Sequence, residues 1–485
     1  MLARDLFYSL LASLFCGVAP ARGAPVEPGP LPLAVVERAA AAGIPLEAIG
    51  AIVIRRGTAL PVIAHQASRG FQPASTMKVL TTAVALDTLG PDYRARTELI
   101  AGAPARGGTL RGDLALRGFG DPDFDVPAFE RMLRRLRASG VRDIRGDLVL
   151  DRTFFTPART DQGLPPFDEA PEFRYNVIPD ALLLNTNLMH LEVAAKAGRV
   201  AIEASPALPG LRLRSAMTLV DEPCERWDDL WRTPTLHADA RGTFTATLQG
   251  ELPRDCAFGT DIAILDRDDF IERTFRTSWS NMGGRFHGRV HEGRADAGAG
   301  VVATHTSRAL AELVRDVDKR SDNPTARTVW LTLGALATGP SEGTTAQRAD
   351  RVVREWLHAQ AVSDDGLVLE NGSGLSRLER IAPVTLAGVV ERALDGPWAP
   401  EFVSSLPIVG VDGGMRHRLA DTPAAKRARF KTGTLRDTWA VAGFVDAADG
   451  ARYVVVAMVN RDGALARDAR GVLDALIAEV AKGVP

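Results

Sequence analysis

Pro73-Ala74-Ser75-Thr76-Met77-Lys78 opens the segment that decides how this chain folds and where its chemistry lies. Thr76–Leu89 (TMKVLTTAVALDTL) has apolar residues at helical spacing, so the sequence predicts a helix with Ser75 at its N-terminus. Residues three apart share a helix face, about 5–6 Å apart at Cβ, which places the Ser75 hydroxyl beside the Lys78 amine. A buried lysine amine, unlike a guanidinium, can lose its charge and act as a base. The alternative is that Ser75 only caps the helix and Lys78 is a solvated first-turn residue.

The composition decides how informative the Ser75–Lys78 pair is. Lysines and arginines together number 58, and only six of them are lysines. Roughly 0.2 Ser-x-x-Lys pairs are expected by chance at these frequencies, so the match is informative without being decisive. A hydrophobic content of 46% with 24% charged residues is typical of globular proteins and excludes wholesale disorder. The formal net charge of −2 gives no case for nucleic acid or an anionic membrane as partner.

The N-terminus predicts export. An apolar run, Leu6–Val18, follows Arg4 and precedes the small residues Ala19-Pro20-Ala21. The run is too short for a stable membrane span, so residues 1–21 are interpreted as a secretory signal peptide with an approximate cleavage site. Its removal takes away Cys16 and leaves Cys224 and Cys256. In an oxidising compartment these two are expected to form a disulfide, and two separate buried thiols are the alternative.

The length of 485 residues predicts two or three domains. Leu33–Ala41 is expected to be a short helix, and Ala48–Arg55 and Leu60–His65 a strand pair. From residue 93 to 274 the pattern changes to short strand-like runs separated by Gly and Pro, with one helical stretch at Val126–Ser139. We interpret 93–274 as a β-rich inserted region, expected to comprise two subdomains.

The C-terminal part returns to longer elements. Trp439–Val445 and Arg452–Val459 predict two strands around a turn, and Leu465–Lys482 predicts a final helix with one apolar stripe. Packing of that stripe on the core is favoured over a helix lying on a membrane, so membrane contact is at most peripheral.

Two further motifs extend the Ser75–Lys78 pair. Ser321-Asp322-Asn323 follows a helical run, and Lys431-Thr432-Gly433-Thr434 precedes the strand at Trp439. Taken singly, the first is a polar loop that caps the next helix and the second an edge strand with a glycine. Together and in this order, they match the Ser-x-x-Lys, Ser-x-Asn and Lys-Thr-Gly motifs of the penicillin-recognising serine acyl-transferases.

The chain resembles the low-molecular-mass class C penicillin-binding proteins, the D-alanyl-D-alanine carboxypeptidase/endopeptidases of the DacB type. About 246 residues separate Ser75 from Ser321, which is similar to the large insertion of this family and longer than a compact β-lactamase allows. One departure is Asn371, where the family pattern has aspartate. The other supporting segments are Gly120-Asp121-Pro122, 147–155, Asn371–Arg377, Leu406–Gly413 and Ala442-Gly443-Phe444.

The resemblance implies an α/β sandwich, with an antiparallel sheet flanked by helices, formed by residues 25–92 and 275–485. It implies that Ser75 attacks the D-Ala-D-Ala amide, that neutral Lys78 takes its proton, and that Ser321 relays a proton to the leaving nitrogen. Substrate contacts are expected from Asn323 to a peptide carbonyl and from Lys431, Thr432 and Thr434 to the terminal carboxylate. The backbone N–H groups of Ser75 and Thr434 are expected to form the oxyanion hole.

The implied partners are peptidoglycan stem peptides and, as covalent inhibitors, β-lactam antibiotics. Asp168 is a candidate contact for the amine of a diaminopimelate side chain, with an Asx-turn as the alternative. No organic cofactor or metal is expected: His287 and His291 are four apart, but Gly288 stands where a zinc-peptidase motif needs Glu. The sequence carries no signal for an oligomeric state. Alternatives to the peptidase are a β-lactamase or esterase of the same fold, and a peptidoglycan-binding regulator with weak activity.

Overall fold

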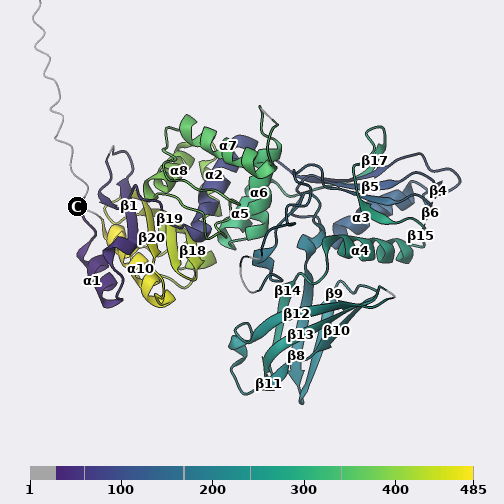
Figure 1. Ribbon diagram of the computed structural model, residues 1–485. Coiled ribbons are helices and arrows are strands. Elements are labelled where there is room, and N and C mark those ends of the chain that lie inside the picture. Colours follow the sequence, from purple (N-terminus) through teal and green to yellow (C-terminus); the bar gives the residue numbers. More distant parts are fainter. Residues whose placement is uncertain are drawn as a thin grey trace, which may run out of the picture.

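A five-stranded antiparallel sheet is built from both ends of the chain (Figure 1). The computed structural model describes residues 29–483, except 59, 166, 168, 169, 241 and 340, and the expected signal peptide lies outside this range. In spatial order the strands are β18 (Ala428–Leu435), β19 (Thr438–Asp446), β20 (Arg452–Asn460), β1 (Ile49–Arg55) and β2 (Ile63–His65).

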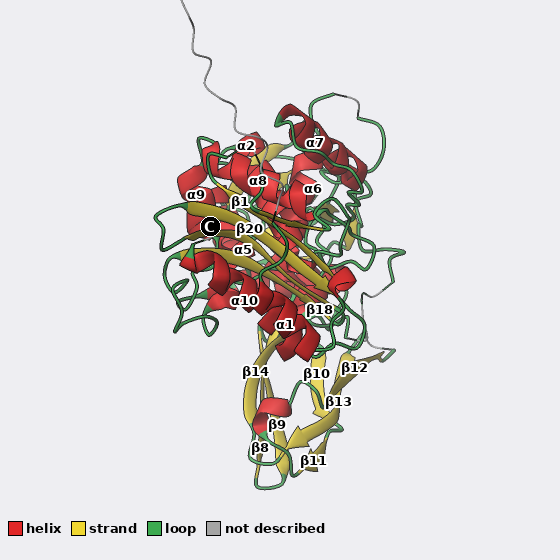
Figure 2. Ribbon diagram, turned by 90° about the vertical axis from the view of Figure 1, so that its left-hand side faces the viewer, coloured by secondary structure: helices red, strands yellow, loops and turns green. Residues whose placement is uncertain are grey.

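Helices cover both faces of this sheet (Figure 2). Alternate residues of β20 point to opposite faces of the sheet. Val455 and Val459 pack against α1 and α10 on one face, and Val454 and Val456 pack against α2 and α8 on the other. This two-sided burial explains why β20 is apolar almost throughout. The flanking helices are α1 (Leu33–Ala41), α10 (Ala466–Lys482), α2 (Met77–Leu89) and α8 (Pro383–Asp395), with α5 (Leu310–Lys319), α6 (Asn323–Ala335), α7 (Thr345–Ala359) and α9 (Ala399–Ser405) around α2.

The predicted sandwich and its main elements are therefore confirmed. The final helix packs on the sheet through Val472, Leu473 and Ile477, as its apolar stripe predicted, whereas Leu465 lies one residue before the helix and is 65% exposed. In the described part of the chain, no helix combines the length and apolarity needed to cross a membrane.

The other strands and helices surround two further apolar cores, and we propose that the inserted region forms two bodies around them (Figure 1). In the first, α3 (Val126–Ala138) and α4 (Arg267–Asn281) pack with two sheets around a common apolar core. The five-stranded sheet has the order β16 (Val290–Glu292), β7 (Leu148–Asp151), β5 (Leu114–Gly118), β3 (Arg96–Ala101) and β17 (Gly300–Thr306), and the smaller sheet β15 (Arg285–Phe286), β6 (Asp143–Ile144) and β4 (Thr109–Leu110).

This body extends past the expected boundary at 274. Strands β15, β16 and β17 pair with strands that precede that position, so we propose that the inserted region ends near Thr306. Helix α4 was not expected, although its Phe270, Ile271, Phe275 and Trp279 stand at helical spacing and are buried.

The second body is a β-sandwich-like unit. Its core contains Trp231, Leu248 and Cys256, and a disulfide joins Cys256 to Cys224 with a Cα–Cα distance of 5.2 Å. The strands are β14 (Ala257–Ile262), β8 (Met189–Lys196) and β9 (Arg199–Ser205) in one sheet, and β10 (Leu211–Ser215), β13 (Phe244–Pro253), β11 (Thr218–Val220) and β12 (Trp231–Ala238) in the other.

Candidate active site

Ser75 lies in a 3₁₀ turn, Ala74–Thr76, that leads directly into α2. Its neighbour Ala74 has a φ of 46°, an unusual left-handed conformation for a residue with a side chain. Two glycines pack closely against this turn. A Cβ added to Gly374 would lie 1.8 Å from the Ala74 carbonyl oxygen, and a Cβ added to Gly433 would lie 2.5 Å from the Pro73 carbonyl oxygen. The close packing of three backbone segments therefore fixes the position of the Ser75 hydroxyl.

Lys78 is one turn further along and fully buried, with 0% exposure. Its Nζ lies 2.9 Å from Ser75 Oγ, 2.6 Å from Asn323 Oδ1 and 2.6 Å from the backbone oxygen of Ser373. The structure thus brings the first motif together with the asparagine of the second, across 245 residues of sequence.

The electrostatic surroundings of Lys78 favour the neutral amine. Burial lowers the pKa of Lys78 well below its usual value, and the charge of Lys431 lowers it further. The carboxylates of Asp318, Asp322 and Glu379 act in the opposite direction but do not outweigh burial. Because its pKa is lowered in this way, Lys78 is better suited than a solvated lysine to accept a proton.

Ser321 and Lys431 form a second hydrogen-bonded pair. Lys431, on β18 and 1% exposed, donates from Nζ to Ser321 Oγ at 3.0 Å and to the Thr432 carbonyl at 2.8 Å. Ser321, like Ala74, has a left-handed backbone, with a φ of 59°. Burial lowers the pKa of Lys431 to about 8, and the charge of Asp318 opposes this shift.

A cavity of about 570 Å³ borders this second pair, and Ser321, Lys431 and Thr432 line it. Thr434, two residues further along β18, is exposed. The cavity continues over Gly413, Gly414 and His417, which come from the loop between α9 and β18. A cationic group and a hydroxyl at the wall of an open cavity suit an anionic ligand.

The loop that supplies the Ser373 carbonyl belongs to Asn371–Arg377, which the family resemblance singles out in the sequence without assigning it a contact with Lys78. Asn371 Oδ1 accepts hydrogen bonds from the Ser373 N–H at 3.0 Å and the Ser373 hydroxyl at 2.7 Å, and its amide donates to the Leu375 carbonyl at 2.9 Å. Glu379, fully buried beneath the loop, accepts from the backbone N–H groups of Glu370, Asn371 and Gly372. The departure at Asn371 is therefore accommodated by hydrogen bonds of both its side-chain oxygen and its side-chain nitrogen within the loop.

Sequence reasoning did not identify a segment of the inserted region, Arg174–Asp180, that reaches the second motif. We call it the strap. Asn323 Nδ2 donates to the Tyr175 carbonyl at 3.0 Å, and Arg174 pairs with Asp322 at 2.8 Å. The buried Arg327 of α6 donates to the Val177 carbonyl at 3.1 Å. The strap therefore connects the inserted region to the N-terminus of α6.

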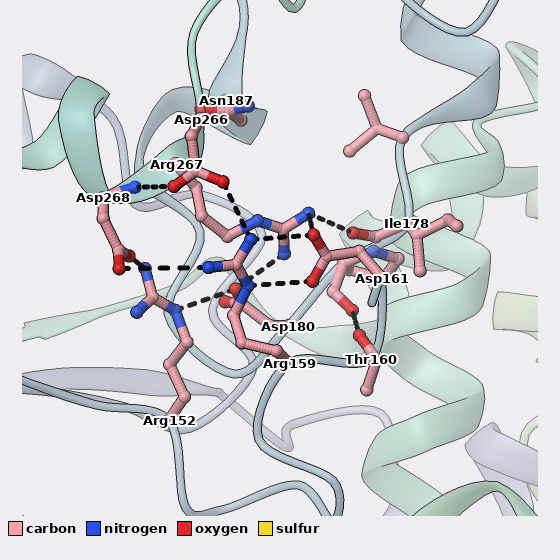
Figure 3. Close-up of polar contacts among 12 residues, drawn as sticks. Arg152, Arg159, Thr160, Asp161, Ile178, Asp180, Asn187, Asp266, Arg267 and Asp268 are labelled. Atoms are coloured by element: carbon pink, nitrogen blue, oxygen red, sulfur yellow. Dashed lines mark hydrogen bonds and ion pairs between the residues drawn. The ribbon is translucent and has the colours of Figure 1, made fainter. Parts of the chain in front are cut away.

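The far end of the strap is held by a cluster of arginines and carboxylates (Figure 3). Asp180 is fully buried and pairs with Arg267 at 2.6 Å and with Arg152 at 2.8 Å. Arg267 also donates to the Ile178 carbonyl at 3.1 Å. Arg159 and Asp161 extend the cluster toward Asp266 on the N-terminal cap of α4.

Asp168 lies outside the described residues. The Cys224–Cys256 disulfide lies in the second inserted body, whose apolar core is separate from the cores around α2 and the sheet.

Comparison with known proteins finds relatives over most of the chain. The family model described as D-Ala-D-Ala carboxypeptidase 3 (S13) matches residues 34–480. A D-alanyl-D-alanine carboxypeptidase of Actinomadura sp. (strain R39) is 30% identical over 418 residues, which cover 83% of this chain and 76% of that protein. The D-alanyl-D-alanine carboxypeptidase DacB of Haemophilus influenzae is 27% identical over 393 residues, which cover 80% of each chain.

The fold has solved counterparts. The structure of penicillin binding protein 4 (dacB) from Haemophilus influenzae matches with a TM-score of 0.77 at 24% identity, covering 92% of this chain and 98% of that one. The family match spans the whole fold, from α1 to α10, and includes all three motifs. The chain belongs to the D-Ala-D-Ala carboxypeptidase 3 (S13) family of serine-type carboxypeptidases.

Proposed function

We propose that this protein is an exported D,D-peptidase that works through an acyl-enzyme on Ser75. It would cleave the carboxy-terminal D-Ala-D-Ala bond of peptidoglycan stem peptides and also D-Ala–diaminopimelate cross-links. The family match supports the carboxypeptidase activity, and the resemblance to the DacB-type class supports the endopeptidase activity. Export to the periplasm rests on the predicted signal peptide at residues 1–21.

The contacts of Lys78 carry the mechanism. A neutral amine has two hydrogens and one lone pair, and the oxygens of Asn323 and Ser373 are both acceptors at 2.6 Å. When they take the two hydrogens, the lone pair is left for the Ser75 hydroxyl at 2.9 Å. Lys78 is then oriented to accept the Ser75 proton as Oγ attacks the substrate carbonyl.

The remaining steps depend on the hydrogen-bonded pair of Ser321 and Lys431. The attack forms a C–O bond and an oxyanion, which the backbone N–H groups of Ser75 and Thr434 would stabilise. Because Lys431 donates to Ser321 Oγ, the Ser321 hydroxyl hydrogen is left for the leaving nitrogen as the C–N bond breaks. Lys78 would return the proton to Ser321, and water would then hydrolyse the ester.

Substrate contacts complete the proposal. Lys431, Thr432 and Thr434 would bind the terminal carboxylate, and Asn323 a peptide carbonyl. Asp168 is proposed to contact the diaminopimelate amine. A β-lactam presents a similar amide and carboxylate, and a structure of the Haemophilus influenzae protein is a complex with a β-lactam. We therefore propose that β-lactams acylate Ser75 and that the ester is released slowly.

A labelled penicillin tests the nucleophile. The purified protein should form a covalent adduct that peptide mass spectrometry places on Ser75, and Ser75→Ala should form none. Folded wild-type protein without an adduct would refute the assignment. Rapid release of the adduct would indicate a β-lactamase instead. Digestion of purified sacculi then separates the two activities, because carboxypeptidase action releases D-alanine and endopeptidase action splits cross-linked dimers.

A further inference from the structure

Asp318 is a buried carboxylate that the proposed mechanism does not use. It lies on α5, three residues before Ser321, and its side chain is 0% exposed. Oδ2 accepts from the Ser405 hydroxyl of α9 at 2.8 Å and from the Thr82 hydroxyl of α2 at 3.2 Å. In the described part of the chain, Oδ1 has no hydrogen-bond partner.

The hydroxyls of Thr82 and Ser405 give the carboxylate only weak hydrogen bonding. Each hydroxyl carries one hydrogen, and each also lies 2.8 Å from a backbone oxygen, that of Lys78 for Thr82 and that of Phe402 for Ser405. A buried carboxylate with only shared donors is costly unless an opposite charge lies nearby. The compensation must therefore come from charges rather than from hydrogen bonds.

Both active-site lysines lie near Asp318. The Thr82 hydroxyl that contacts Asp318 also contacts the backbone oxygen of Lys78, and Lys431 donates to Ser321, three residues after Asp318. Burial raises the pKa of Asp318 to about 6, and the charges of Lys431 and Lys78 oppose this rise. The charge of Asp318 in turn raises the pKa of Lys431, against the lowering by burial. For Lys78 the lowering by Lys431 exceeds the raising by Asp318. A carboxylate, one ammonium and one neutral amine give the buried set a net charge of zero.

We propose that Asp318 is the internal counterion of Lys431, a positioning residue that keeps this lysine charged for the substrate carboxylate while Lys78 stays neutral. The inference rests on the proposed function and deepens it. It explains how two buried lysines hold different protonation states: the carboxylate stabilises the ammonium on β18, and that ammonium disfavours a second charge on α2.

Lysine side-chain NMR tests the proposal independently of activity. With only six lysines in the chain, spectra of protein labelled at lysine Cε are simple, and Lys431→Arg assigns the Lys431 signal. Asp318→Asn should lower the titration midpoint of Lys431 by about one pH unit, the size expected for two charges within about 10 Å in a protein interior. Ser405→Ala removes a hydrogen bond and keeps the charge, so the midpoint should stay in place.

Asp318→Leu, with an apolar side chain suited to a buried position, is a second variant and should give the same shift. Wild-type protein offers a third measurement, because the Lys431 signal should show an additional inflection near pH 6 as Asp318 ionises. An unchanged midpoint in a folded variant, or a single inflection in the wild type, would overturn the proposal. The penicillin adduct on Ser75, scored separately, reports on the proposed function itself.

Kinetics gives the functional consequence. At pH 8, Asp318→Asn should raise KM several-fold for a peptide ending in D-Ala-D-Ala and change kcat less, because carboxylate binding is what is lost. The same peptide with an amidated C-terminus lacks the carboxylate and should show no comparable change. Equal losses for both peptides would contradict the assigned role.

Discussion

Asn323 bonds at the same time to the proposed catalytic base and to the inserted region. Its oxygen accepts from Lys78 at 2.6 Å, and its nitrogen donates to the Tyr175 carbonyl at 3.0 Å. The amide therefore cannot rotate without losing one of the two bonds. The strap Arg174–Asp180 consequently fixes which atom of Asn323 faces the lysine, and the inserted region contributes to the geometry of the site.

Breaking the anchor of the strap should reduce both stability and acylation. Arg267→Met leaves Asp180 with one of its two arginines and removes the donor to the Ile178 carbonyl. We expect a loss of about 3 kcal/mol in the free energy of unfolding, because one partner of a buried pair is removed. The rate of penicillin acylation, measured by stopped flow, should fall at least several-fold, because a displaced strap no longer orients Asn323 toward Lys78.

The matched control lies on the same helix. Arg276 pairs with Glu272 at the surface of α4, donates to the Gly288 carbonyl and lies over the Phe286 ring. Because these contacts are exposed, Arg276→Met should cost about 1 kcal/mol, clearly less than Arg267→Met. Its acylation rate should equal that of the wild type. If Arg267→Met acylates at the wild-type rate, the strap does not position Asn323.

Removing the amine of Lys78 should abolish the proton transfer. Lys78→Met retains the length and apolar stem of the side chain but has no base, so the acylation rate constant should fall at least about 10³-fold. The measurement is single-turnover formation of the penicillin adduct. Lys196→Met, at an exposed position on β8, is the control and should react at the wild-type rate.

The pH dependence of acylation should be bell-shaped. Lys78 must be neutral, and burial lowers its pKa, so activity rises as pH passes through that lowered value. Lys431 must be charged, so activity on substrates with a carboxylate falls as pH rises above about 8. Lys431→Arg keeps its charge at these pH values, and its profile should lose the alkaline decline even if the maximum rate is lower. A wild-type profile that still rises at pH 10 would contradict this assignment.

The sequence predicted the central sheet and the three motifs because both depend on local patterns. Apolar strands and helical spacing indicate the elements, and the resemblance placed the motifs in one site. The sequence could not predict that the Ser373 and Tyr175 carbonyl oxygens contact Lys78 and Asn323. A backbone oxygen has no residue signature, and its position depends on how the loop packs. Asp318 did carry a signal: it stands four residues after the buried Val314 and eight after Leu310, on the apolar stripe of α5.

The glycine beside the nucleophile offers a test of backbone packing. Gly374 has a φ of 82°, and an added Cβ would lie 1.8 Å from the Ala74 carbonyl oxygen. Gly374→Ala should displace the Ser75 turn and lower the acylation rate at least about 10²-fold, since a shift of about 1 Å at a reacting group has this effect. The rate of adduct formation and the thermal midpoint give the two readouts.

A control at Gly366 distinguishes the effect of the left-handed backbone from the effect of the close contact. It also has a left-handed φ, 67°, but an added Cβ would meet no atom within 4 Å. Gly366→Ala should therefore show only the conformational cost, about 1–2 kcal/mol, and acylate at the wild-type rate. Equal acylation rates in the two variants would mean that the contact at Gly374 does not hold the nucleophile.

The disulfide should stabilise the second inserted body without affecting the chemistry. Cys224 and Cys256 are 32 residues apart, and closing a loop of this length contributes about 3–4 kcal/mol in the chain-entropy model. The double variant Cys224→Ser, Cys256→Ser should therefore expose β12 and β13 to hydrogen exchange while α2 and β18 keep their protection. Because the core around the disulfide is distinct from the core beneath Lys78, penicillin should acylate Ser75 at the wild-type rate. A slower rate together with intact protection of α2 would show instead that this body bears on the active site.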